Sequence, residues 1–137
     1  MARILVVEDE QTIALVLKIA LGDVGHEVST APNGQAGLAH LGQSPAPDLL
    51  ITDLKLPDIS GRVLVETMSV SPRLKDIPVL IITGSLPGPQ DVPPRGSYQA
   101  LVNKPFDLEH IKNLVALLTN PAAGVPAGRS ASVKTAE

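Results

Sequence analysis

Side chains that can bind metal ions and phosphate follow short apolar runs at four places in this chain of 137 residues. The residues concerned are Glu8 with Asp9, Asp53, Thr83 and Lys104. Carboxylates brought within a few ångströms of one another repel, so a group of three calls for a cation. A set of oxygen ligands without His or Cys suits a hard ion such as Mg²⁺, which accepts a couple of carboxylates and keeps water ligands.

A carboxylate beside Mg²⁺ can also attack phosphorus as a nucleophile and form an aspartyl phosphate. Lys104 would then pair with the phosphate oxygens as a point charge, and Thr83 would donate a hydrogen bond to one of them. These residue types therefore indicate transfer of a phosphoryl group to an aspartate.

These side chains meet only if the apolar runs are neighbouring strands of one sheet. Continuous runs rich in β-branched residues are typical of strands covered on both faces, as in parallel sheets. The sequence predicts such strands at residues 4–7, 49–51 and 79–82, and shorter ones at 27–30 and 100–103. The carboxyl ends of parallel strands share one edge of the sheet, where ligands bind in open α/β folds.

Helical patterns separate the predicted strands. The first helix has apolar residues at three- and four-residue spacing on one face: Ile13, Val16, Leu17, Ala20 and Val24. The last helix shows the same spacing: Leu108, Ile111, Val115 and Leu118. Gly25 is placed to end the first helix and Asp107 to cap the last one. Weaker helical patterns cover residues 34–41 and 61–68.

The alternation of strands and helices predicts an α/β fold, a doubly wound five-stranded parallel sheet of flavodoxin-like order 2-1-3-4-5. The Pro-rich stretch 84–96 stands before the last strand, so we expect the fourth helix to be degraded or irregular. We assign residues 1–119 to the folded domain. Residues 120–137 contain no Leu, Ile, Met or aromatic residue and are expected to form a flexible C-terminal tail.

The amino-acid composition excludes several kinds of site and several kinds of binding partner. The absence of Cys excludes Cys-ligated zinc, iron–sulfur clusters and thiol chemistry. No apolar run approaches the roughly 20 residues that span a membrane, and the apolar run near the start is too short for a secretory signal. The net charge is −3 and the sequence has no cluster of basic residues, so it shows none of the concentrated positive charge that is typical of nucleic-acid-binding proteins. We therefore expect a cytoplasmic protein that binds neither membranes nor nucleic acid.

Several motifs together resemble the receiver domain of bacterial response regulators. The matching pieces are VVEDE at 6–10, TDLKLPDISG at 52–61, Thr83 after its apolar run, and Lys104-Pro105-Phe106. They occur in the family's order and cover about residues 2–119, so the folded domain would be a receiver domain.

The resemblance implies a role for each matching residue. The implied metal ligands are Asp9 directly, Glu8 through water, Asp53, and the backbone carbonyl of Lys55. Asp53 would be the phosphoacceptor, while Thr83 and Lys104 would bind the phosphate and act as the switch. The Lys104–Pro105 bond would be the family's cis peptide. Receivers commonly have Tyr or Phe three residues before this lysine, where this chain has Leu101, with Tyr98 further upstream.

The sequence thus predicts a single-domain response regulator of a two-component phosphorelay, with Mg²⁺ as its cofactor. It would be a switch that assists only its own phosphorylation and dephosphorylation, not an enzyme. The expected partners are a histidine kinase or histidine phosphotransfer protein and a downstream protein target. A second copy of the chain, in a homodimer, is a further candidate partner.

Two alternatives have different functions. A receiver-like module that binds without phosphorylation predicts the loss of a site residue, whereas every site residue is present. A phosphatase of the haloacid-dehalogenase type needs a second Asp two residues after the nucleophile as general acid, where this chain has Lys55.

Overall fold

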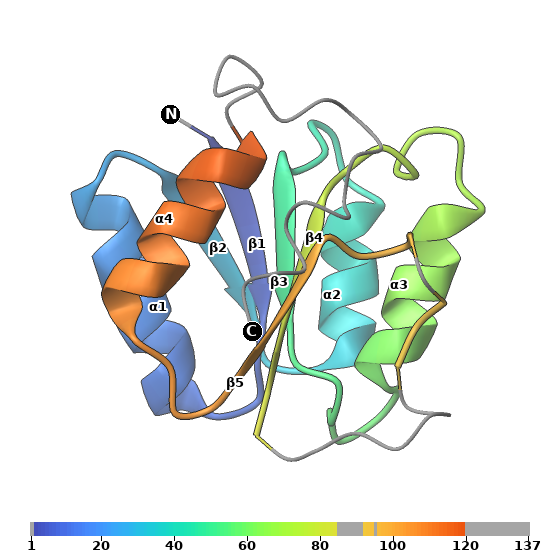
Figure 1. Cartoon of the computed structure of the whole chain (residues 1–137). Coiled ribbons are helices and arrows are strands. Elements are labelled where there is room, and N and C mark those ends of the chain that lie inside the picture. Colours follow the sequence, from blue (N-terminus) through green and yellow to red (C-terminus); the bar gives the residue numbers. More distant parts are fainter. Residues whose placement is uncertain (1, 85–91, 95, 120–137) are drawn as a thin grey trace.

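The computed structural model describes residues 2–84, 92–94 and 96–119, which form a five-stranded parallel sheet and four helices (Figure 1). The elements are β1 (Arg3–Val7), α1 (Gln11–Asp23), β2 (Glu27–Ala31), α2 (Gly34–Leu41), β3 (Leu49–Thr52), α3 (Gly61–Ser69), β4 (Val79–Thr83), β5 (Ala100–Asn103) and α4 (Leu108–Thr119). The strand order is β2-β1-β3-β4-β5, which confirms the predicted topology.

The strand register brings the ends of the strands to one edge of the sheet. Each predicted strand is present to within one residue of its predicted bounds. Val7 at the end of β1 pairs with Thr52 at the end of β3, and Thr83 at the end of β4 pairs with Asn103 at the end of β5. The polar residues that follow these strands therefore leave the sheet at a common rim, where doubly wound folds bind ligands.

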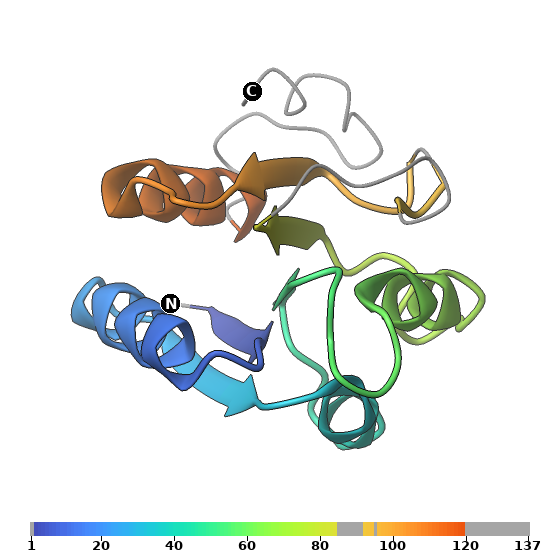
Figure 2. The ribbon, with the colours of Figure 1, turned by 90° about the horizontal axis from the view of Figure 1, so that it is seen from below.

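Helices cover both faces of the sheet, α1 and α4 on one face and α2 and α3 on the other (Figure 2). Side chains alternate between the faces along each strand. In β1, Ile4 and Val6 belong to the core beneath α1 and α4, while Leu5 and Val7 belong to the core beneath α2 and α3. Burying each such side chain stabilises the fold by roughly 1.5–3 kcal/mol, and the cores on both faces thus stabilise the sheet that carries the rim.

The buried face of α1 is narrower than the predicted one. Leu17 and Leu21 pack against the sheet, but Val16 and Val24, which the pattern placed on the same face as Leu17, are exposed. Periodicity alone could not choose the buried stripe, because apolar residues occur around most of this helix. Gly25 follows the helix at φ 100°, a conformation that glycine adopts without strain, as predicted for its end.

The connection from β4 to β5 is described only in part. Residues 92–94 and 96–99 contain no helix, while 85–91 and 95 lie outside the described residues, as does the predicted tail 120–137. Asp107 accepts a hydrogen bond from the backbone N–H of Glu109 at 3.0 Å, as predicted for the cap of α4. No helix in the described part of the chain is long and apolar enough to cross a membrane.

Candidate functional site

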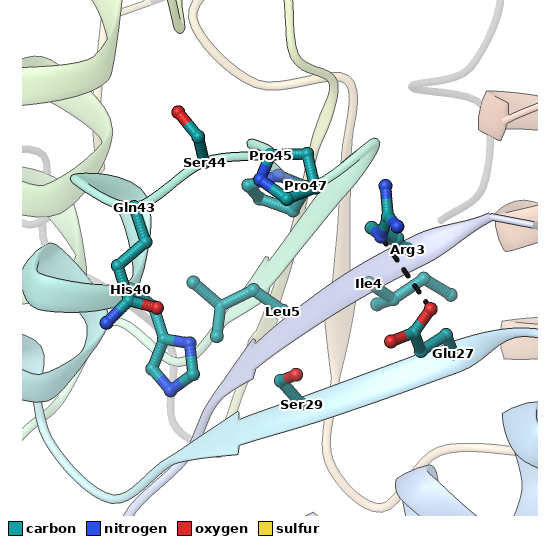
Figure 3. Close-up of a pocket in the computed structure, with 10 residues that line it drawn as sticks. All are labelled: Arg3, Ile4, Leu5, Glu27, Ser29, His40, Gln43, Ser44, Pro45 and Pro47. Carbon is teal, nitrogen blue, oxygen red and sulfur yellow. Dashed lines mark ion pairs between the residues drawn. The ribbon is translucent and has the colours of Figure 1, made fainter.

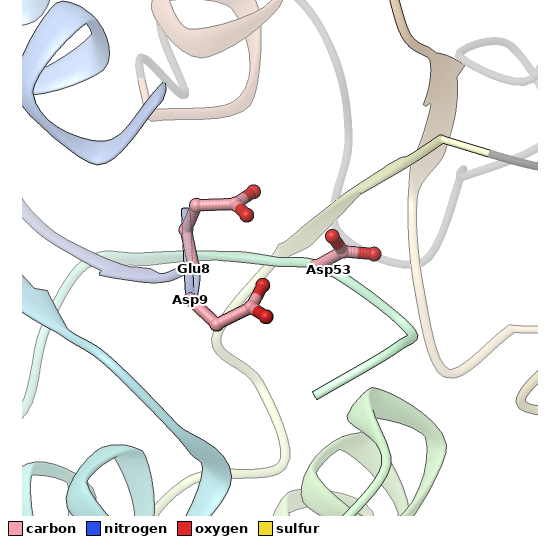
Figure 4. Close-up of side chains that lie close together, drawn as sticks. All are labelled: Glu8, Asp9 and Asp53. Atoms are coloured by element: carbon pink, nitrogen blue, oxygen red, sulfur yellow. The ribbon is translucent and has the colours of Figure 1, made fainter. Parts of the chain in front are cut away.

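Three carboxylates gather at the rim formed by the ends of β1 and β3 (Figure 4). Glu8 and Asp9 follow β1, and Asp53 follows the neighbouring strand β3. One oxygen from each of the three side chains lies within 4.8 Å of the others. Glu8 and Asp53 are buried, whereas Asp9 is exposed. The three residues that the sequence placed in one metal site are therefore together in the structure.

The ammonium group of Lys104 lies among these carboxylates. Its Nζ is 2.9 Å from Oδ2 of Asp53, 3.1 Å from Oε1 of Glu8 and 3.1 Å from Oε1 of Glu10. The backbone positions Lys104 at the rim, because its N–H donates to the carbonyl oxygen of Thr83 at 2.8 Å, continuing the β4–β5 pairing. The sequence did not predict the contact with Glu10.

Burial and hydrogen bonding set the charges of this cluster. Burial raises the pKa of the Glu8 carboxyl, and hydrogen bonds from the Glu10 backbone N–H and from Lys104 only partly oppose it. Burial by itself lowers the pKa of the Lys104 ammonium, but its hydrogen bonds to Asp53, Glu8 and Glu10 outweigh this and hold the pKa above its ordinary value. Lys104 is therefore positively charged at neutral pH.

The loop after β3 is packed closely around the backbone of Asp53. The N–H of Lys55 donates to Oδ1 of Asp53 at 3.1 Å, and the N–H of Gly61 donates to the carbonyl oxygen of Leu54 at 2.9 Å. A Cβ atom on Gly61 would lie only 2.1 Å from the carbonyl oxygen of Asp53. Glycine is thus required where α3 begins, because the helix approaches the backbone of Asp53 so closely.

Asp58 joins this loop to the beginning of α2. Its carboxylate accepts the backbone N–H groups of Gly34 and Gln35, each at 2.8 Å, and of Ile59 at 2.7 Å. Slight desolvation would raise the pKa of Asp58, but these donors lower it overall. This contact could not be predicted from the sequence, because residue types do not reveal which helix a loop carboxylate will reach.

Thr83 and Pro105 lie where the sequence placed them. Thr83 is buried at the end of β4, and the Lys104–Pro105 peptide bond is cis. Tyr98 and Leu101 are partly buried against the core beneath α2 and α3. The position three residues before Lys104 therefore contributes an aliphatic side chain to that core.

The donor set fits a divalent cation with a preference for oxygen. At this rim, within the described residues, the ammonium of Lys104 faces the carboxylates of Glu8, Glu10 and Asp53, with Asp9 beside them. One positive charge does not balance these four carboxylates, so a small dication would offset most of the remaining negative charge. Mg²⁺ fits these ligands better than a softer metal, which would call for His or Cys.

A cavity of about 240 Å³ lies at the opposite end of the sheet, near the starts of β1 and β2 (Figure 3). Arg3 and Glu27 form an ion pair of 3.6 Å there, and His40 from α2 also lines the space. Glu8, Asp9 and Asp53 do not line this cavity. The cavity therefore has no part in the candidate site.

Comparison with known proteins identifies the family. The family model of the response regulator receiver domain matches residues 4–116. The chain belongs to this family. The receiver fold and the assignment to two-component signalling made from the sequence are thereby confirmed.

Individual relatives agree with this assignment. The chain is similar to RpaA from Synechocystis, described as a DNA-binding dual master transcriptional regulator. The two are 32% identical over 92% of this chain and 52% of RpaA. The chain is also 35% identical to Protein PilH from Pseudomonas aeruginosa, over 61% of this chain and 68% of PilH. The chain spans about half or less of the length of the first curated relatives that it matches.

Among solved structures, the receiver domain resembles the response regulator TrrA from Thermotoga maritima in complex with Mg²⁺–BeF. The identity is 31% and the TM-score 0.75, over 86% of this chain and 99% of that one.

Proposed function

We propose that this chain is a cytoplasmic response regulator that accepts a phosphoryl group on Asp53 and signals through protein contacts. Mg²⁺ would be held by Glu8, Asp9, Asp53 and the backbone carbonyl of Lys55. The observation that carries the proposal is the position of the Lys104 ammonium, 2.9 Å from Asp53 and beside the group of three carboxylates. A point charge there can pair with the oxygens of a phosphoryl group on Asp53.

The phosphoryl donor in this proposal is a phosphohistidine of a kinase or phosphotransfer protein. An Asp53 carboxylate oxygen attacks phosphorus, the phosphorus–nitrogen bond breaks, and its electron pair stays on the imidazole nitrogen, which is then protonated by solvent. Bound Mg²⁺ supplies charge neutralisation for the phosphoryl oxygens. Lys104 pairs with the same oxygens, and Thr83 donates a hydrogen bond. The chain thus contributes positioning and charge, the main requirements of phosphoryl transfer.

The new phosphate would then act on the rim as a switch. It adds negative charge and acceptor oxygens beside Asp53, which attract Lys104 and Thr83. Both residues lie at the ends of β4 and β5, so their movement shifts an existing conformational equilibrium in the adjoining loops. A downstream protein that prefers the shifted conformation would receive the signal.

Phosphorylation by a small-molecule donor tests the proposal. The chain is incubated with acetyl phosphate, with and without Mg²⁺, and its intact mass is measured. We expect the mass to rise by one phosphoryl group only with Mg²⁺, and Asp53→Asn to abolish the gain. Asp76→Asn, at an exposed turn, is the matched control and should be phosphorylated like the parent. Equal uptake by Asp53→Asn and the parent would refute the assignment.

A further inference from the structure

The three N–H donors of the Lys104 ammonium are all engaged in this structure. An ammonium group has three donors and no acceptor. In the described part of the chain, three carboxylates lie within hydrogen-bonding distance of Nζ: those of Asp53, Glu8 and Glu10. Lys104 must therefore release one of them before it can donate to a phosphoryl oxygen.

The three partners differ in what their release would cost. The side chains of Glu8 and Asp53 are 3% and 6% exposed, so in the metal-free, unphosphorylated protein either would be left as a buried charge without its cation. The Glu10 side chain is 61% exposed, so water hydrates its carboxylate at once when the ion pair opens. Glu10 is the partner that Lys104 gives up most readily.

The backbone holds Glu10 in place for this contact. Its N–H donates to Oε2 of Glu8 at 3.1 Å, and its carbonyl oxygen accepts the N–H of Ala14 in the first turn of α1 at 3.0 Å. The side chain itself makes no capping hydrogen bond to α1. The structure thus fixes the position of Glu10 while leaving its carboxylate available to Lys104.

We propose that Glu10 is a positioning residue that holds Lys104 in the unphosphorylated protein and so slows phosphorylation of Asp53. This inference rests on the proposed function. Before transfer, Glu10 occupies one donor of Lys104 and adds a negative charge that repels an anionic donor. As the bond from Asp53 to phosphorus forms and the donor's bond to phosphorus breaks, Lys104 exchanges Glu10 for a phosphoryl oxygen.

The same negative charge has the opposite effect on a metal ion. Glu10 lies close enough to share Lys104 with Asp53, so its charge attracts a dication to the site. Removing this charge should speed transfer from an anionic donor and weaken Mg²⁺ binding. Structural damage to the rim would instead slow transfer and weaken Mg²⁺ binding together, so the pair of measurements separates the two explanations.

The test uses Glu10→Gln, which keeps the size of the side chain and removes its charge. The matched control is Glu27→Gln, since Glu27 is also 61% exposed and forms an ion pair with Arg3 at the other end of the sheet. Initial rates are measured with acetyl phosphate at saturating Mg²⁺, where the carboxylate displaces acetate from phosphorus. Mg²⁺ dissociation constants are measured calorimetrically without donor.

We expect Glu10→Gln to be phosphorylated roughly three- to tenfold faster and to bind Mg²⁺ roughly two- to fivefold more weakly. Both differences should shrink at high salt, because Glu10 is exposed, and Glu27→Gln should match the parent. If the parent is phosphorylated and Glu10→Gln is no faster, the role of Glu10 is wrong and the proposed function stands. If the parent itself takes up no phosphoryl group, both are wrong.

Discussion

Replacing Gly61 by Ala would place a methyl group 2.1 Å from the carbonyl oxygen of Asp53 and 2.9 Å from Cα of Leu54. Both neighbours are backbone atoms, which cannot rotate away as a side chain can. Since ordinary contacts begin near 3.4 Å, the start of α3 and the acceptor loop must separate by about 1 Å. We expect a loss of about 1–3 kcal/mol in the free energy of unfolding, as for other overpacked sites.

The same displacement should slow phosphorylation more than it lowers stability. A shift of about 1 Å in a reacting group can cost on the order of 100-fold in rate, so the initial rate with acetyl phosphate should fall by about that factor. Stability is measured by urea denaturation, which is followed by circular dichroism. The rate is measured from the intact mass without urea, where the variant is folded.

Gly22→Ala provides the matched control for this prediction. Nothing lies within 4 Å of a Cβ atom on Gly22, which is inside α1. Alanine is favoured over glycine in a helix by roughly 0.5–1 kcal/mol, so this variant should be slightly more stable and phosphorylated normally. If Gly61→Ala is as stable as Gly22→Ala and reacts at the parent's rate, the close approach of α3 to Asp53 does not constrain the site.

Two further variants test the charges. Lys104→Met leaves the buried carboxylates of Glu8 and Asp53 without their cation, so we expect the free energy of unfolding in EDTA to fall by about 3 kcal/mol. Mg²⁺ should then raise the Tm of the variant more than that of the parent. Equal increases in Tm with Mg²⁺ would contradict this prediction. The His26 Nδ1 accepts the N–H of Ala2 at 3.1 Å, and burial lowers the pKa of His26 below its usual 6.5. The unfolded chain therefore binds this proton first as the pH falls, and stability declines below about pH 6.5. Between pH 7.5 and 5.5, the free energy of unfolding of His26→Gln, measured by urea denaturation, should fall less than that of the parent. If the two free energies differ by the same amount at every pH, His26 does not have this role.

The strands and the rim could be predicted because the apolar runs and the alternation of strands with helices both indicate the same fold. The runs that contain Leu5, Ile51 and Ile81 are apolar at successive positions and rich in β-branched residues, which is typical of strands buried on both faces. Once they are parallel neighbours, the residues after them must meet. The pairing of Val7 with Thr52 then brings Glu8, Asp9 and Asp53 together without further information.

Other contacts depend on geometry that residue types do not encode. Lys104 reaches Glu10 because its long side chain extends from the end of β5 toward the start of α1, and nothing in the spacing of these residues specifies that direction. Asp58 caps α2 from a loop that follows β3, so its partners are distant in sequence. Val16 was predicted to be buried and is exposed, because the sheet contacts only a narrow stripe of α1.

Chemical mapping of the acyl phosphate tests the role of Asp53 most directly. The chain is phosphorylated with acetyl phosphate and Mg²⁺, reduced with borohydride, which converts an aspartyl phosphate to homoserine, and digested for peptide mass spectrometry. We predict homoserine at position 53, and only when donor and Mg²⁺ are both present. Reduction at Asp9 or Glu8 instead, or unmodified Asp53 in a chain that has gained a phosphoryl group, would contradict the proposed site.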